Sequence, residues 1–113
     1  MHGHWGIGLS SDQYGLLVGG KSVAYTQDRT IDEGDWSGCD LVIEASGAHK
    51  QSQLLQKYLE QGVKRVLVTQ PVKEPGILNV VMGVNDKLYD PAKHFIVTAA
   101  SCTTNCLAPV VKV

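Results

Sequence analysis

The chain has 113 residues, a formal net charge of −1 and 43% hydrophobic residues. This length supports one small domain with a hydrophobic core. The balanced charge excludes a strongly basic nucleic-acid surface, and the apolar runs are too short to cross a bilayer. Three cysteines at irregular spacing are no disulfide framework. We therefore expect reduced thiols in a cytoplasmic protein, with neither a nucleic acid nor a membrane as partner.

The first twelve residues show no hydrophobic periodicity and predict no regular element. His2 and His4 are the only residues there that suggest a metal site. Because no cysteine or carboxylate follows at a ligand spacing, we expect that the chain binds no metal.

Residues 15–26 predict a β-hairpin, because two short apolar runs flank Gly19 and Gly20. Glycine accepts the positive φ angles that tight hairpin turns require. Residues 30–40 are polar and acidic, and they predict a loop with at most a short helical turn. Trp36 is expected to anchor this loop by packing.

Residues 41–68 predict a strand, a helix and a second strand. Leu41 to Ile43 are wholly apolar, as in a parallel strand that is buried on both faces. Residues 49–61 predict a helix that ends at Gly62, a left-handed cap, and whose apolar face holds Leu54, Leu55, Tyr58 and Leu59. A second apolar run at 66–68 then pairs in parallel with the first.

The rest of the chain continues the same alternation. Residues 79–84 predict a strand, residues 85–93 a turn, and residues 95–98 another strand, after which a helix follows. The fold class is therefore α/β, a partial doubly wound (Rossmann-like) parallel sheet. No GxGxxG turn with an acidic residue beyond it is present, so the pyrophosphate-binding βαβ unit is not among these elements.

Cys102 lies where a strand turns into a helix. The first N–H groups of a helix have no partner within it, so they stabilise a thiolate or the oxyanion that forms when a thiolate attacks a carbonyl. Ser101, Thr103 and Thr104 add hydroxyls that can bind an anion or simply cap the helix. Cys106 lies one turn on, either as a redox partner or, as we expect, as a small buried side chain.

The run Ser101–Pro109, with the sequence SCTTNCLAP, resembles the active-site signature of the phosphorylating glyceraldehyde-3-phosphate dehydrogenases. The resemblance extends upstream through His2-Gly3, Gln27-Asp28-Arg29, Glu44 to Gly47, Lys64-Arg65-Val66 and Met82 to Asn85. The chain is well under half of a full family member, so it is expected to be a fragment. Residues 1–100 would be the later part of the dinucleotide-binding domain, and residues 101–113 the start of the catalytic domain.

The resemblance implies that Cys102 attacks the aldehyde of glyceraldehyde 3-phosphate to give a thiohemiacetal. Hydride transfer to NAD or NADP then gives a thioester, which inorganic phosphate cleaves. Ser101, Cys102 and Thr103 would bind the substrate or phosphate. A catalytic histidine and a phosphate-binding arginine would come from residues outside this chain.

The resemblance also implies a set of cofactor-binding residues, namely Arg29, Ser46, Gly47 and Thr69. Two of them depart from the family pattern. Ala45-Ser46 replaces Ser-Thr, so a backbone contact is expected there, and Thr69 replaces a serine.

Other interpretations remain open. The substrate could be erythrose 4-phosphate, because the residues that select the substrate are not in the chain. The chain could also be a non-catalytic nucleotide-binding module or a thiol redox module that uses Cys102 and Cys106. The family forms homotetramers, whereas the fragment alone is expected to be inactive, poorly stable and prone to associate through an exposed sheet edge.

Overall fold

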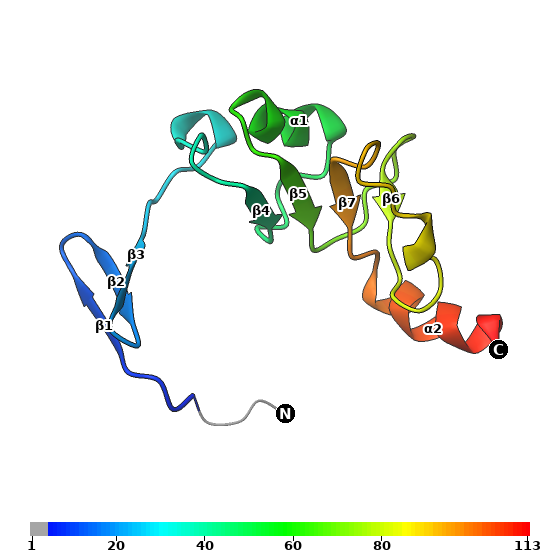
Figure 1. Cartoon of the computed structure of the whole chain (residues 1–113), viewed down its shortest axis with the longest axis horizontal. Helices are drawn as coiled ribbons and strands as arrows, with labels where there is room; N and C mark the ends of the chain where they lie inside the picture. Colours follow the sequence, from blue (N-terminus) through cyan, green and yellow to red (C-terminus); the bar gives the residue numbers. More distant parts are fainter. Residues whose placement is uncertain (1–4) are drawn as a thin grey trace. The chain divides into compact units, whose positions relative to one another are not determined.

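The computed structural model describes residues 5–113, so His2 and His4 lie outside the described residues. The chain forms two compact units, one ending at Gly34 and one running from Asp35 to Val113 (Figure 1). No helix in residues 5–113 combines the length and the hydropathy that a membrane span requires.

The first unit is an antiparallel sheet of three short strands, β1 (Leu9–Asp12), β2 (Gly15–Val18) and β3 (Lys21–Ala24). The expected hairpin between β2 and β3 is confirmed. Gly19 and Gly20, at its turn, have φ angles of 57° and 80°, which only glycine adopts without strain.

Strand β1 was not expected from the sequence. It pairs with β2 because the carboxylate of Asp12 closes the turn between them, accepting hydrogen bonds from the N–H groups of Tyr14 (2.7 Å) and Gly15 (3.1 Å). A short 3₁₀ helix, η1 (Ile31–Glu33), then forms the helical turn that the acidic loop allowed.

The second unit contains a four-stranded, entirely parallel sheet in the order β4-β5-β7-β6 (Figure 1). Its strands are β4 (Leu41–Glu44), β5 (Arg65–Val68), β6 (Leu78–Asn79) and β7 (Ile96–Thr98). The α/β fold class is thereby confirmed as part of a Rossmann-like sheet. Because all four strands are parallel, their carboxyl ends meet at one edge.

Helix α1 (Ser52–Glu60) connects β4 to β5, and α2 (Cys102–Lys112) follows β7. A 3₁₀ helix, η2 (Asp86–Leu88), lies in the expected turn. The expected end of α1 is confirmed, because Gly62 has a φ angle of 101° and donates a hydrogen bond to the carbonyl of Leu59.

Helix α1 begins at Ser52, three residues after the expected start. Residues 49–51 belong to a polar turn instead of the helix. Within this turn the N–H of Ala48 donates to the hydroxyl of Ser46 (3.1 Å), which in turn contacts the carboxylate of Glu44. Short side chains that bond the nearby backbone compete with helix formation in this way.

The core lies on one face of the parallel sheet. Val42, Val66 and Ile96 are register partners on that face, and Leu55 of α1 is completely buried. On the opposite face Leu41 and Ile43 are 54% and 60% exposed. The expectation that their strand is buried on both faces is therefore wrong, because within residues 35–113 no element covers the second face of β4.

The prediction of a strand at residues 79–84 is also wrong, because β6 contains only Leu78 and Asn79. Side-chain amides replace the missing strand pairing. The N–H of Val81 donates to the side chain of Asn85 (2.7 Å), and the Asn85 amide donates to the carbonyl of Asn79 (2.9 Å). Asparagine side chains that bond the local backbone favour turns over strands.

Leu55→Ala should destabilise the second unit by about 2–5 kcal/mol, because it removes a fully buried side chain and leaves a cavity. The matched control is Leu88→Ala, at a leucine that is 63% exposed, which should change stability by less than about 0.5 kcal/mol. Urea denaturation followed by circular dichroism measures both. Equal losses would contradict this location of the core.

Candidate active site

Cys102 is the first residue of α2 and is exposed to solvent. Strand β7 ends at Thr98, and only three residues separate it from the helix. Among them Ala100 has a φ angle of 56°, and it is the single residue other than glycine with a positive φ in the described chain. This left-handed residue makes the turn sharp, at a cost of about 1–3 kcal/mol.

Hydroxyl groups surround the start of α2, as expected. Ser101 is the N-cap, and its side chain accepts a hydrogen bond from the N–H of Thr104 (3.1 Å). The same oxygen lies 3.0 Å from the hydroxyl of Thr103 and 2.7 Å from that of Thr104. The three hydroxyls therefore form one cluster beside the sulfur-bearing residue.

The Asn105 side chain ties this turn to the first turn of α2. Its amide nitrogen donates to the carbonyl of Ala99 (2.8 Å) and to that of Ser101 (2.9 Å). Both carbonyls are thereby tied to α2, so the turn and the helix form one unit. Asn105 was part of the sequence motif, but this role was not expected from the sequence.

The main-chain N–H groups of Cys102 and Thr103 cannot bond within α2, because the first residues of a helix have no preceding turn. The first turn of α2 also carries no acidic residue, and its last turn carries Lys112. The positive end of the helix dipole is therefore available to an anion at Cys102. A thiolate, or an oxyanion beside the sulfur, meets this requirement.

Cys106 is exposed like Cys102, and all three cysteines are free thiols. The expectation that Cys106 is a small buried side chain is wrong. Helix α2 presents nearly all of its side chains to solvent within the described structure, so nothing covers this position. Cys39, by contrast, is half-buried.

The expected nucleotide-binding residues of the second unit lie along the carboxyl edge of the sheet. Ser46 and Gly47 follow β4, and Thr69 follows β5, which is the neighbour of the strand that leads to Cys102. The N–H of Thr69 donates to the carbonyl of Glu44 (3.0 Å), which fixes the register of this edge. The structure therefore places these residues and Cys102 at one edge of the sheet.

Gly47 has a φ angle of 78°, and no atom lies within 4 Å of the position that a Cβ would occupy. The backbone there is open to close approach by a ligand. Arg29 belongs to the first unit, where its N–H donates to the carboxylate of Glu33 (2.8 Å). Its role toward a cofactor stays a prediction.

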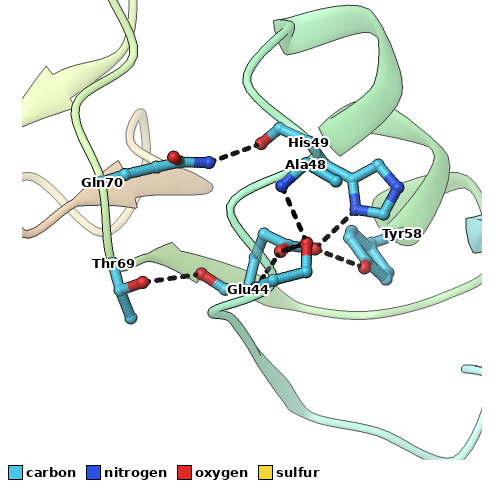
Figure 2. Close-up of polar contacts among 7 residues, drawn as sticks. Glu44, Ala48, His49, Tyr58, Thr69 and Gln70 are labelled. Atoms are coloured by element: carbon cyan, nitrogen blue, oxygen red, sulfur yellow. Dashed lines mark hydrogen bonds and ion pairs between the residues drawn. The ribbon is translucent and has the colours of Figure 1, made fainter.

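A buried carboxylate organises the turn after β4. Glu44 is the last residue of β4, and Figure 2 shows its carboxylate between His49 and Tyr58. His49 Nδ1 and the Tyr58 hydroxyl each lie 2.9 Å from Glu44 Oε2. The N–H and hydroxyl of Ser46 donate to Oε1 at 2.8 and 2.5 Å. Each carboxylate oxygen is therefore hydrogen-bonded, as a buried charge requires.

Two neighbouring contacts connect this turn to β5 (Figure 2). The Thr69 hydroxyl donates to the carbonyl of Glu44 (3.3 Å), and the Gln70 amide lies 3.5 Å from the carbonyl of His49. The hydroxyls of Ser46 and Thr69 are thus used within the protein. A ligand at this edge would meet backbone groups and small side chains first.

Burial raises the pKa of the Glu44 carboxyl, but the hydrogen bonds from Ser46, His49 and Tyr58 outweigh that effect, and the pKa lies below its ordinary value of 4.5. Burial and the Glu44 carboxylate both raise the pKa of Tyr58. Glu44 is therefore a carboxylate and Tyr58 a neutral donor at neutral pH.

Sequence reasoning missed the Glu44 network, although a signal was present. In the strand Leu41–Glu44, Glu44 shares the inward face with Val42, so a charged residue falls on an apolar face. Tyr58 is the only member of the apolar helical face that carries a hydroxyl. A buried carboxylate facing a buried tyrosine is a pairing that this pattern could have indicated.

The residues that the structure describes contain no group of three His, Cys, Asp or Glu side chains that could hold a metal ion. The carboxylates of the acidic loop take other partners. The side chain of Asp35 accepts hydrogen bonds from the N–H and hydroxyl of Ser37, and Asp40 pairs with Lys64 (2.6 Å).

No family model matches the chain. The chain is, however, similar along its length to curated proteins named as glyceraldehyde-3-phosphate dehydrogenases. It is 46% identical to glyceraldehyde-3-phosphate dehydrogenase 3 of Nostoc sp. (strain PCC 7120), over 100% of this chain and 34% of that protein. The enzymes of Chlamydia pneumoniae (39%, over 99% of the chain) and Geobacillus stearothermophilus (38%, over 100%) match over 34% of their lengths. The chain thus spans about a third of these relatives.

Glu44 should make the second unit sensitive to acid. Because its folded pKa lies below the ordinary 4.5, the carboxylate contributes stability above that pH, and the contribution is lost as the pH falls below it. Glu44→Gln should therefore reduce the loss of unfolding free energy as the pH falls below about 5, through the lowered pKa of Glu44, and should leave the range from neutrality to about pH 5 nearly unchanged. Glu60→Gln, at an exposed position of α1, is the control and should keep the full dependence. Urea titrations at several pH values measure the unfolding free energy of each variant as a function of pH. Identical slopes in the two variants would contradict the role of Glu44.

Proposed function

Because this chain belongs to the glyceraldehyde-3-phosphate dehydrogenase family, we propose that it carries the nucleophile of an aldehyde oxidation. One observation supports the proposal above others. Cys102, within the family signature, is exposed at the first residue of α2, where main-chain N–H groups without a partner in the helix are available to an anion. An ordinary structural cysteine has no need of exposure or of a helix start.

In the proposed reaction the thiolate of Cys102 attacks the carbonyl carbon of an aldehyde. A carbon–sulfur bond forms, and the carbonyl oxygen gains a proton to give a thiohemiacetal. When bound, NAD or NADP supplies the acceptor for the hydride of that carbon, and the hydroxyl proton is released as a thioester results. An oxygen of inorganic phosphate then attacks the thioester, the carbon–sulfur bond breaks, and an acyl phosphate leaves with the thiolate restored.

The start of α2 supplies what these steps need from the protein. The N–H groups of Cys102 and Thr103 can stabilise the oxyanion that forms at each attack on a carbonyl. Ser101 and Thr103 offer hydroxyls to the substrate phosphate or to inorganic phosphate. The two hydroxyls contact each other at 3.0 Å. Both lie at the N-terminus of α2, which is the positive end of the helix dipole.

The carboxyl edge of the parallel sheet suits a dinucleotide. Ser46, Gly47 and Thr69 line this edge with small groups, and the open space above Gly47 permits a close approach of a cofactor to the backbone. NAD is the proposed cofactor, with NADP as the alternative, and Arg29 is proposed to contact its adenine side.

The chain spans about a third of its relatives, so the activity belongs to the whole protein. We propose that residues 1–100 are part of its dinucleotide-binding domain and residues 101–113 the start of its catalytic domain. Glyceraldehyde 3-phosphate is the proposed substrate, with erythrose 4-phosphate as the alternative. The whole protein is proposed to form a homotetramer, which accords with the exposed apolar side chains of α2, namely Leu107, Val110 and Val111.

The phosphate-dependent step can be tested in reverse on the 113-residue chain. Acetyl phosphate should transfer its acetyl group to Cys102, because a thiolate with an adjacent oxyanion site attacks the acyl carbon and phosphate leaves. Mass spectrometry of a tryptic digest identifies the modified cysteine. Cys106→Ser should keep the acetylation, and Cys102→Ser should abolish it. Equal acetylation of Cys102 and Cys106, at two exposed positions of one helix, would contradict the proposal.

A further inference from the structure

Thr98, the last residue of β7, lies directly beneath the turn that delivers Cys102, and its side chain is completely buried. The N–H of Ala100, the left-handed residue of the turn, donates to the Thr98 hydroxyl (3.1 Å). Because Ala100 is strained, this contact opposes the tendency of the turn to relax toward an ordinary conformation. Nothing in the proposed chemistry uses Thr98 itself.

The Thr98 hydroxyl has a second partner. It donates to the side-chain oxygen of Asn79 at 2.6 Å, while it accepts from Ala100. A hydroxyl can do both at once, whereas a carbonyl oxygen can only accept and a main-chain N–H can only donate. Thr98 therefore connects the strained turn to the neighbouring strand β6.

Asn79 is itself held on both sides. Its side-chain oxygen accepts from the N–H of Val72 (3.2 Å), and its amide donates to the carbonyl of Val72 (2.9 Å). Its own carbonyl accepts from the side chain of Asn85 (2.9 Å). Asn79 is thus a rigid acceptor for the Thr98 hydroxyl, with the loop after β5 behind it.

We propose that Thr98 and Asn79 are positioning residues for Cys102. Their hydrogen bond fixes the left-handed turn at Ala100 and, through it, the direction in which the first N–H groups of α2 point. The proposal deepens the proposed function, because it concerns the same nucleophile, but it makes its own structural claim. Thr98 faces a core position where valine would be the ordinary choice, so the hydroxyl is the informative group.

Thr98→Val tests the claim, since it keeps the shape of the side chain and removes only the hydroxyl. Its matched partner, Thr98→Ser, keeps the hydroxyl and loses a methyl group. Thr26→Val makes the same chemical change at an exposed threonine of the first unit, and it serves as the control for a threonine-to-valine change away from the site. Circular dichroism confirms that each variant is folded, and Asn79→Ala provides a second way to break the contact.

Two readouts separate this proposal from the proposed function. In ¹⁵N–¹H spectra, Thr98→Val should displace the amide signals of Ala100, Cys102 and Thr103, whereas Thr98→Ser and Thr26→Val should leave them near their original positions. Alkylation of Cys102 by iodoacetamide should slow by about two- to tenfold in Thr98→Val and Asn79→Ala, as expected for the loss of one hydrogen bond, and should recover in Thr98→Ser.

The outcomes are distinct. Unmoved amide signals of Cys102 and Thr103 in Thr98→Val would overturn the positioning role, whatever the reactivity of the thiol. An equal slowing in Thr98→Val and Thr98→Ser would also overturn it, because packing and not the hydroxyl would then matter. Displaced signals with rescue by serine would support it even if acetyl phosphate failed to acylate Cys102, a result that would count against the proposed function alone.

Discussion

The turn at Ala100 is the constraint on which the site depends. It converts the end of a buried parallel strand into the first turn of an exposed helix, and it does so with a left-handed residue that carries a side chain. Two sets of hydrogen bonds hold it, from Thr98 below and from Asn105 in the helix above. Cys102, which follows the N-cap Ser101 as the first residue of α2, is therefore delivered to solvent together with unpaired main-chain N–H groups.

The parallel sheet explains why the polar groups gather where they do. Glu44, Val68 and Thr98 are register partners in the last row of the buried face, and Asn79 continues that row into β6. Polar side chains thus occupy both ends of one row at the carboxyl edge. Each of these side chains is hydrogen-bonded, so its burial costs little free energy. Each also orders the turn that follows its strand. The carboxyl edge, where a cofactor is proposed to bind, is thus stabilised by buried residues that do not themselves belong to the proposed site.

Much of the local structure could be predicted from the sequence. The hairpin at Gly19-Gly20, the strand–helix–strand unit ending at Gly62, and the helix that begins at Cys102 all carry strong signals, namely paired glycines, apolar periodicity and a serine cap. The wrong predictions about burial share a cause. The burial of Leu41, Ile43 and Cys106 was inferred as if other elements covered them, whereas in the described chain one face of β4 and most of α2 are exposed.

The polar networks could not be predicted in the same way, because they join residues that are distant in sequence. Tyr58 meets Glu44 only after α1 packs on the sheet, and Thr98 meets Asn79 only after β6 and β7 pair. A hydroxyl on an apolar face indicates that some partner exists, but not which one. The late start of α1 has a local cause instead, since the turn from Ala45 to Gln51 is organised around the carboxylate of Glu44, which the helical pattern does not reveal.

If the start of α2 activates the thiol, Cys102 should be a better nucleophile than Cys106, which is also exposed on the same helix. Competitive alkylation with a limiting amount of iodoacetamide, read residue by residue by mass spectrometry, measures the rate of Cys102 relative to Cys106 in the folded chain and in concentrated urea. The account predicts that Cys102 reacts faster in the folded chain, with the advantage largely lost in urea. Equal rates in the folded chain would contradict it.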